Sequence, residues 1–211
     1  MNILAIDASG KLLGLCLRCE GQQSAYLTQP LEHIEYLPEI LQRFCSSQAL
    51  LPSELNALAV IQGPGSYTGL RGSLLLAKSL ALLKGVPVMT RLRHEVLLYA
   101  SRQRQEDVLV SQSVRQQQYY LALGRYHEQA VHYRLAPHLG TAAGLLDIQQ
   151  QFSCPVLGDW PAEQERPLEY LEVTDLSCPL AEWTEADFCP VDPDSLVPFY
   201  VRPAVKPLDK V

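Results

Sequence analysis

The sequence predicts an α/β protein built from two lobes of similar topology, the second of them reduced. Two observations support this fold class. Three consecutive apolar segments separated by turns open the chain, and the same plan of three strands returns after residue 104. Between these triplets, a strand, a glycine-rich loop, an apolar helix and a further strand form a pattern typical of a parallel β-α-β unit. We therefore predict a first lobe over residues 1–104 and a second lobe with a C-terminal tail over residues 105–211.

The elements of the first half follow from the apolar pattern. "NILAID", "LLGLCLRC" and "QSAYLTQ" are expected to be strands, with turns at "SGK" and "EG". The segment 31–48 repeats apolar side chains at helical spacing, and Pro38 either lies in its first turn or kinks it. "ELNALAVIQ" and "GVPVM" are the strands before and after a helix over 68–84, and "RHEVLLYASRQRQ" is a shorter helix.

The second half begins in the same way and then loses its clear pattern. "EDVLVSQSV", "RQQQYYLALGRY" and "QAVHYRLA" are expected strands. After residue 140 the signal is weak: "CPVLGDW" predicts a strand and turn, and the prolines of "CPLAEWTEADFCPVDPD" leave room for only a short helix. "LVPFYVRPAVKPLDKV" is typical of an extended tail.

Composition and charge exclude several classes of protein. Hydrophobic residues make up 47% of the chain and charged residues 19%, which predicts a packed protein with apolar surface left for a partner. The net charge of −6 argues against a stand-alone nucleic-acid binder, because phosphate binding requires clustered lysine and arginine. No basic leader precedes "MNILAIDAS", and no apolar run approaches the ~20 residues of a membrane span, so we expect a cytoplasmic protein without membrane contact.

The six cysteines are expected to be reduced thiols. Cys16 and Cys19 have the C-x-x-C spacing, but residues three apart on a strand point to opposite faces, so we predict no metal or redox site there. His127, His132 and His138 follow no metal-binding motif and are expected at the surface.

The stretch "GPGSYTGLRG" places a glycine-rich loop at the start of the helix over 68–84. It fits neither the P-loop, nor the dinucleotide-binding, nor the nucleophile-elbow pattern. A tight turn with Ser66 or Thr68 as the helix cap is the plainer hypothesis, and contact with an anion at the helix N-terminus is the alternative.

The helix over 68–84 is apolar on almost every side. Leu70, Leu74, Ala77 and Ala81 form one face, further leucines cover the rest, and Arg71 with Lys78 is the only polar stripe. A helix of this kind is buried on nearly all sides. One face can pack on its own sheet, and the opposite face then requires another lobe or another chain.

Four stretches together resemble the TsaB-type family of tRNA threonylcarbamoyladenosine biosynthesis proteins: "ILAIDAS", His33 ahead of a helix with "LP", "GPGSYTGLRG…AKSLA" and "PFYVRP". The resemblance implies the two-lobed actin-like ATPase fold of sugar kinases, heat-shock proteins and actin. It also implies a non-catalytic scaffold subunit that pairs with a TsaD-type catalytic subunit, joined by a TsaE-type ATPase. Together they would modify the adenosine beside the anticodon in tRNAs that read codons beginning with A. This chain would touch tRNA only through the complex and would form a homodimer when alone.

The resemblance also assigns sites. It places the partner contact on the two helices of the first lobe, with these candidate residues: Ile34, Leu37, Leu41, Phe44, Leu70, Leu74, Ala77, Lys78 and Ala81. It implies no cofactor of the chain's own, but ATP or ADP at the interface shared with the catalytic subunit. The candidates for this nucleotide or interface loop are Asp7, His33, Gly63, Pro64, Gly65, Ser66, Thr68, Gly69 and Arg71.

Departures from the family pattern bear on catalysis. Enzymes of this fold hold a metal-bound nucleotide with carboxylates from both lobes, and "SVRQQQYY" has the neutral Ser113 and Gln118 at the acidic positions. We therefore expect no independent ATP hydrolysis and no metal site, and predict that Asp7 caps the turn at Ser9 and Gly10. Two alternatives stay open: a stand-alone ATPase or peptidase, and a homodimeric degenerate actin-like protein.

Overall fold

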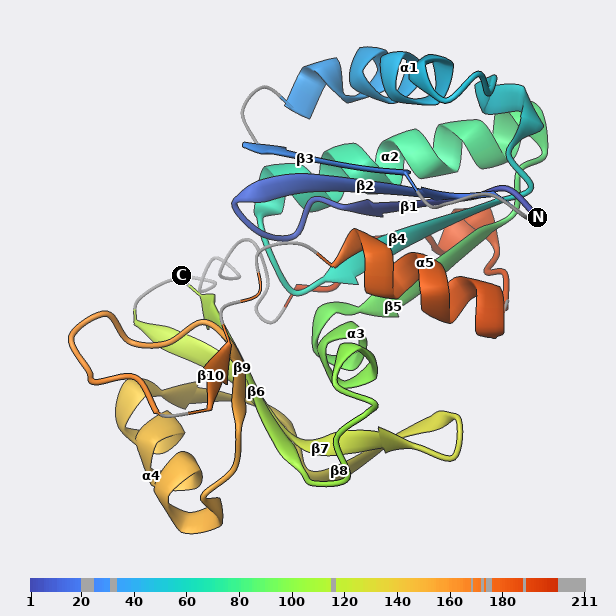
Figure 1. Ribbon diagram of the computed structural model, residues 1–211. Helices are drawn as coiled ribbons and strands as arrows, with labels where there is room; N and C mark the ends of the chain where they lie inside the picture. Colours follow the sequence, from blue (N-terminus) through green and yellow to red (C-terminus); the bar gives the residue numbers. More distant parts are fainter. Residues whose placement is uncertain are drawn as a thin grey trace, which may run out of the picture.

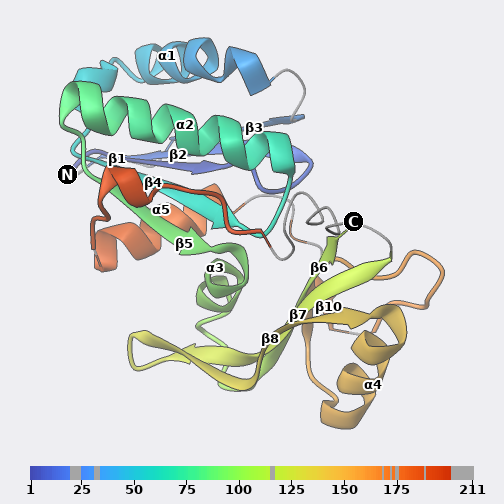
Figure 2. The ribbon, with the colours of Figure 1, turned by 180° about the vertical axis from the view of Figure 1, so that it is seen from behind.

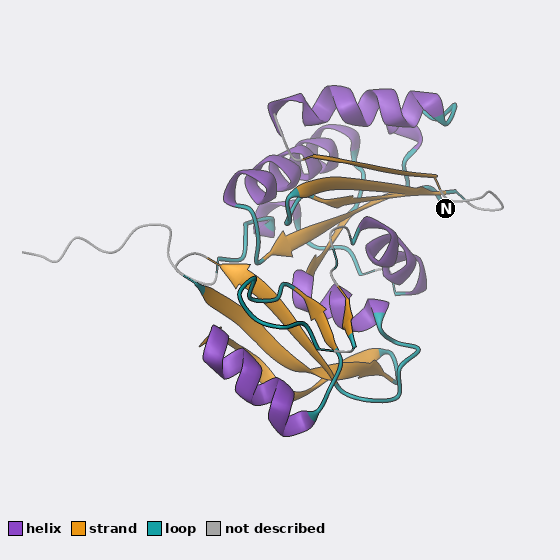
Figure 3. Ribbon diagram, turned by 60° about the vertical axis from the view of Figure 1, so that its left-hand side comes forward, coloured by secondary structure: helices purple, strands orange, loops and turns teal. Residues whose placement is uncertain are grey.

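The computed structural model describes residues 1–19, 25–30, 34–114, 117–167, 169–171, 173, 176–187 and 189–200. These residues form two five-stranded sheets with helices above, between and below them (Figures 1 and 3). The first sheet has the order β3-β2-β1-β4-β5 and the second has the order β10-β9-β6-β7-β8.

The strands of the first sheet are β1 (Ile3–Asp7), β2 (Leu12–Arg18), β3 (Ala25–Pro30), β4 (Ala57–Gly63) and β5 (Val88–Leu92). Those of the second are β6 (Val108–Val114), β7 (Gln118–His127), β8 (Ala130–Thr141), β9 (Val156–Gly158) and β10 (Tyr170–Leu171). The helices are α1 (Leu37–Ser47), α2 (Tyr67–Lys84), α3 (Arg93–Ala100), α4 (Ala142–Phe152) and α5 (Ser177–Ala186), with short 3₁₀ turns η1 (Ile34–Tyr36), η2 (Pro52–Glu54) and η3 (Pro193–Ser195).

The two sheets share one plan, which confirms the predicted repeat. In the first, β1 pairs antiparallel with β2, β2 antiparallel with β3, and β1-β4-β5 run parallel. In the second, β6 and β7, and β7 and β8, are antiparallel, while β6-β9-β10 are parallel. The second lobe is reduced at one point: α2 joins β4 to β5, whereas no helix is described between β9 and β10.

Three apolar clusters hold the layers together. The first joins α1 and α2 to one face of the first sheet. The second joins α3 and α5 to the other face of that sheet and to the facing side of the second sheet. The third covers the far face of the second sheet with α4. Figures 1 and 2 show the same layers from opposite sides.

Most predicted elements are confirmed, and two findings are new. Pro38 lies in the first turn of α1, one of the two predicted alternatives. The sequence analysis missed α4, although Thr141 caps it and Leu145, Ile148 and Phe152 keep helical spacing. The short helix α5, inside the range assigned to the second lobe, packs against β1 and β2 and completes the first lobe.

Some predictions lie outside the described residues: the "EG" turn, the residues before Ile34 that include His33, and the tail beyond Tyr200. Cys16 and Cys19 are described, and they pack against different apolar clusters, as their strand spacing predicts. None of the helices in the described ranges is both long and apolar enough to cross a membrane.

Candidate functional site

The glycine loop between β4 and α2 is packed against the chain's own backbone. The Ser66 amide donates to the Ser9 carbonyl at 2.8 Å. A Cβ atom on Gly65 would lie 2.4 Å from that same carbonyl oxygen, and one on Gly63 would lie 2.5 Å from the carbonyl oxygen of Phe199. Glycine is therefore required here by the close approach of the first hairpin turn and of the C-terminal segment.

The same loop is fixed to the second lobe and to the helix that follows it. Gln112, on β6, donates from Nε2 to the Pro64 carbonyl at 2.7 Å. The Ser66 hydroxyl accepts from the Gly69 amide at 3.3 Å, so Ser66 is the N-cap of α2 and Thr68 lies in its exposed first turn. The turn-and-cap hypothesis thus accounts for the loop without a bound phosphate.

Asp7 ends β1 and is completely buried. Its Oδ1 accepts from the amide, at 2.9 Å, and from the hydroxyl of Ser9, which confirms the predicted turn cap. Its Oδ2 accepts from the Leu176 amide at 2.8 Å and pairs with the Arg93 guanidinium at 3.3 Å. Arg93 also donates to the Val173 carbonyl at 3.1 Å. The carboxylate is therefore neutralised and hydrogen-bonded by protein groups on both oxygens.

A second carboxylate, missed by the sequence analysis, lies at the end of the second sheet. Asp159 directly follows β9, and its Oδ2 accepts from the Ser113 amide at 2.7 Å. The Ser111 hydroxyl donates to the Asp159 carbonyl. The signal in the sequence was an aspartate placed directly after an apolar strand, as Asp7 is at the end of β1.

The side chains predicted to bind a partner lie mostly in the interior. Seven of them expose no more than 8% of their surface: Leu37, Leu41, Phe44, Leu70, Leu74, Ala77 and Ala81. Ile34 is half-buried and packs against Gly72 of α2. Lys78 is half-buried and pairs with Asp194 at 3.1 Å. The prediction assigned the contact to the face of α2 that packs on the chain's own sheet, and this is corrected because that face is already covered.

The opposite face of α2 is left exposed by the residues that the structure describes. The exposed fractions are 67% for Leu75, 60% for Leu82, 80% for Leu83 and 42% for Tyr67. Figure 2 shows α2 below α1 and in front of the first sheet. The apolar side chains therefore continue around the helix onto a free surface, as its nearly uniform hydrophobicity predicted.

The C-terminal strap, residues 191–200, lies beside this face. Val191 bridges to Val88, and Leu196 is buried in the first cluster. The Phe199 amide donates to the Gln62 carbonyl at 2.9 Å, which fixes the strap to the end of β4. Between the strap and α2 lies a groove of about 210 Å³, lined by Arg71, Leu74, Leu75, Lys78, Leu196 and Pro198.

The nucleotide-loop candidates therefore have different surroundings. Gly63, Pro64 and Gly69 are buried, whereas Gly65, Thr68 and Arg71 remain exposed near the N-terminus of α2. Among the candidates that the structure describes, this second set and the half-buried Ser66 are accessible from solvent, while His33 lies outside the described residues.

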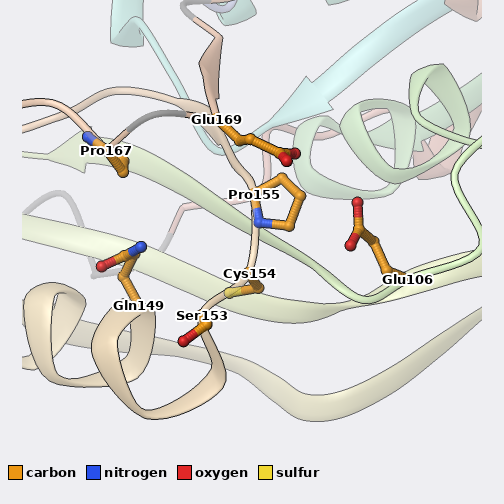
Figure 4. Close-up of a pocket in the computed structure, with 7 residues that line it drawn as sticks. All are labelled: Glu106, Gln149, Ser153, Cys154, Pro155, Pro167 and Glu169. Carbon is orange, nitrogen blue, oxygen red and sulfur yellow. The ribbon is translucent and has the colours of Figure 1, made fainter.

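A second hollow, of about 340 Å³, lies in the second lobe, and Figure 4 shows its lining residues: Glu106, Gln149, Ser153, Cys154, Pro155, Pro167 and Glu169. Arg104 pairs with both carboxylates, at 3.1 Å to Glu106 and 2.8 Å to Glu169. Burial raises the pKa of the Cys154 thiol, which makes it a weak nucleophile. The two carboxylates of the hollow are thus paired with Arg104, and its thiol is a weak nucleophile.

Residues 30–147 match the family model described as TsaD, tRNA N6-adenosine threonylcarbamoyltransferase. The chain is 30% identical over 179 residues to the tRNA threonylcarbamoyladenosine biosynthesis protein TsaB of Bacillus subtilis (strain 168). The aligned residues cover 81% of this chain and 70% of that protein. TsaB of Escherichia coli (strain K12) is 32% identical over 90 residues, or 42% of this chain and 39% of that protein.

Two solved structures from Pseudomonas aeruginosa share the fold. YeaZ has a TM-score of 0.69 at 19% identity, over 94% of this chain and 99% of that chain. An uncharacterized protein with similarity to peptidase YeaZ has a TM-score of 0.71 at 19% identity, over 95% and 99% of the two chains. With the repeated sheet plan, these similarities confirm the two-lobed actin-like fold.

Proposed function

The chain belongs to the TsaB family of tRNA threonylcarbamoyladenosine biosynthesis proteins, and on this premise we propose that it is a non-catalytic scaffold subunit. Its partner is a TsaD-type catalytic subunit that docks on α2, and a TsaE-type ATPase joins the complex in the cytoplasm. The complex forms N6-threonylcarbamoyladenosine beside the anticodon of tRNAs that read codons beginning with A. The acidic chain, with a net charge of −6, contacts tRNA only through its partners.

The observation that carries this proposal is the exposed leucine face of α2. Leu75, Leu82 and Leu83 lie on one helix of 18 residues, about 27 Å long. Contiguous exposed apolar surface on a folded protein marks a site of protein association. A long, straight helix face favours a partner helix packed along it, with apolar side chains interlocking over several turns. When the partner is absent, the same face supports a homodimer.

The buried Asp7–Arg93 pair supports the non-catalytic role. A metal-bound nucleotide would have to displace Arg93 and the Ser9 and Leu176 donors from the carboxylate. The displaced Arg93 guanidinium would then be buried without its partner, and breaking a buried ion pair in this way costs about 3–5 kcal/mol. The position that would hold a metal in an active enzyme of this fold instead joins β1, α3 and the start of α5 within the first lobe.

Nucleotide enters the proposal only at the shared interface. Gly65 and Thr68 remain accessible at the N-terminal end of α2, where backbone amides favour an anion. ATP or ADP would therefore be held jointly with the catalytic subunit rather than in a site of this chain alone.

The test is the affinity of the full chain for the TsaD-type subunit from the same organism, measured by calorimetry. Leu75→Glu and Leu83→Glu should each weaken the complex by 100-fold or more, because they place an unpaired charge in an apolar interface. Leu171→Glu is the matched control, since Leu171 is 58% exposed but lies on β10 of the second sheet. Equal affinities for all three variants would refute docking on α2.

A second measurement tests the non-catalytic role. Reconstituted threonylcarbamoylation of tRNA should require this chain and should be lost with Leu75→Glu. The chain alone should turn over neither ATP nor peptides. Activity of the isolated chain that survives in the Leu75→Glu variant would favour the stand-alone ATPase or peptidase alternative instead.

A further inference from the structure

We propose that the groove between α2 and the C-terminal strap is a socket for one apolar side chain of the catalytic partner, and that Arg71 at its rim binds a carboxylate next to that side chain. The inference rests on the proposed function, because it names the chemistry of a partner segment on the same helix face. It assigns a binding role to the strap, for which the sequence predicted only an extended tail.

The walls of the groove fit an apolar side chain. Leu74 and Leu75 from α2 face Leu196 and Pro198 from the strap, and the volume of about 210 Å³ is larger than one aliphatic or aromatic side chain requires. Val197, 58% exposed on the strap, extends the apolar surface toward solvent. Burial of such a side chain would remove water from both elements at once.

The groove persists because the strap is fixed at both ends of the contact. Asp194 pairs with Lys78 at 3.1 Å on one side of the groove. On the other side, Gln62 donates from Nε2 to the Val197 carbonyl at 2.8 Å. The buried Leu196 anchors the segment between these contacts. A preformed groove lowers the ordering cost of binding.

Arg71 is held in position by the Tyr67 ring, which is supported in turn by Tyr200. Its Nη1 donates to the Tyr67 hydroxyl at 2.6 Å, and its guanidinium carbon lies 5.1 Å from the centre of the Tyr67 ring. Tyr67 in turn stacks on Tyr200 at the end of the strap, with ring centres 5.4 Å apart. The strap therefore builds the groove and also supports the tyrosine that orients the cation.

The charges favour an acidic partner segment. Helix α2 contains no aspartate or glutamate, and its cations are Arg71, Lys78 and Lys84. Asp194 already neutralises Lys78, while Arg71 makes no ion pair with any residue the structure describes. A guanidinium with free donors binds a carboxylate in a fork geometry that an ammonium cannot reproduce. A free phosphate would also meet Arg71, but it would leave the apolar walls of the groove unfilled.

The experiment measures the affinity of the full chain for the TsaD-type subunit at low and high salt, without nucleotide. Arg71→Gln should weaken binding about 10-fold and reduce its salt dependence, and Arg71→Lys should restore only part of the loss. Lys84→Gln is the matched control, because it removes an exposed cation of the same helix outside the groove, and it should change affinity less than about 2-fold. Pro198→Glu should also weaken binding, since it places a charge in the groove.

The supporting role of Tyr200 is tested by a double-mutant cycle. Tyr200→Ala should weaken binding in the unmutated chain but have no further effect in the Arg71→Gln background, because the ring acts through Arg71. Additive effects of the two substitutions would overturn this role.

The remaining outcomes separate the inference from the proposed function. If Arg71→Gln behaves like Lys84→Gln while Leu75→Glu abolishes the complex, the socket is refuted and the docking face stands. If the unmutated chain does not bind the catalytic subunit, the proposed function itself fails. If Arg71→Gln weakens binding only when ATP or ADP is present, the anion is a nucleotide and the carboxylate assignment is overturned.

Discussion

The inner and outer faces of α2 bear the same apolar side chains in opposite surroundings. Leu70 and Leu74 on the inner face are buried against the first sheet, whereas Leu75 and Leu83, on the outer face, are 67% and 80% exposed. The second lobe has no described helix at the equivalent place, between β9 and β10. The difference teaches that the described fold uses the inner face of α2 and leaves its outer face exposed, which is the surface that we propose for association. Substitutions on the two faces should therefore affect different measurements.

The largest effect on stability is expected on the inner face. Leu74→Ala should lower the free energy of unfolding by about 2–5 kcal/mol, because it leaves a cavity in the packed cluster. Leu75→Ala should change it by less than about 0.5 kcal/mol. Urea unfolding followed by circular dichroism measures both. Similar losses for the two variants would mean that the outer face also supports the fold.

The next largest effect is a pH dependence of stability that arises from His94 in the interior. Burial lowers the pKa of the His94 imidazole from 6.5 to about 4, between the rings of Tyr120 and Tyr133 and close to Glu95. The unfolded chain therefore binds more protons than the folded chain between these pH values. The stability associated with neutral His94 is fully present above pH 6.5. It is lost as the pH falls toward 4, and the loss amounts to about 3 kcal/mol of unfolding free energy.

The matched variant for this prediction is His94→Phe, which keeps an aromatic ring and removes the titrating group. The difference between the unfolding free energies at pH 7 and pH 4.5 should be smaller for the variant than for the unmutated chain. The Nδ1 atom of His94 is buried and has no hydrogen-bond partner among the described residues, so the variant need not lose stability at pH 7. An unchanged pH dependence would show that other groups cause it.

Two glycines at opposite ends of α2 sharpen the comparison further. Gly65→Ala should cost about 1–3 kcal/mol, because the new Cβ would lie 2.4 Å from the Ser9 carbonyl oxygen and the loop must move. Gly85→Ala should cost about 1 kcal/mol from the left-handed backbone alone, since φ is +68° and nothing lies within 4 Å. Thermal unfolding measures both. A larger loss of stability for Gly85→Ala than for Gly65→Ala would mean that the loop shifts at little cost in free energy.

The smallest effect on stability is expected at the most exposed leucine. Leu83→Gln should leave the free energy of unfolding within about 0.5 kcal/mol of the unmutated chain, because the side chain makes few contacts in the fold. It should instead reduce self-association, which sedimentation at increasing concentration measures. A loss of stability without any change in association would argue against a free outer face.

Much of the fold could be predicted because local patterns encode it. Apolar runs bounded by turn residues placed β1, β2 and β4, and the spacing of apolar residues placed α1 and α2. Helix α4 was missed although Thr141 offers a cap and Leu145, Ile148 and Phe152 keep helical spacing. The turn cap by Asp7 was predictable from the neighbouring Ser9, but its pairing with Arg93, 86 positions later, was not.

By itself, the sequence determined that α2 is apolar on nearly every side, that Ser66 or Thr68 caps it and that the glycine loop lacks a phosphate-binding pattern. Only the tertiary structure decided which leucines are buried, because a helix apolar all round gives no direction to its own sheet. It also decided that Gly63 and Gly65 meet Phe199 and Ser9, and that the strap forms a groove beside Arg71. Contacts between distant segments depend on how whole elements pack, and no local pattern encodes that choice.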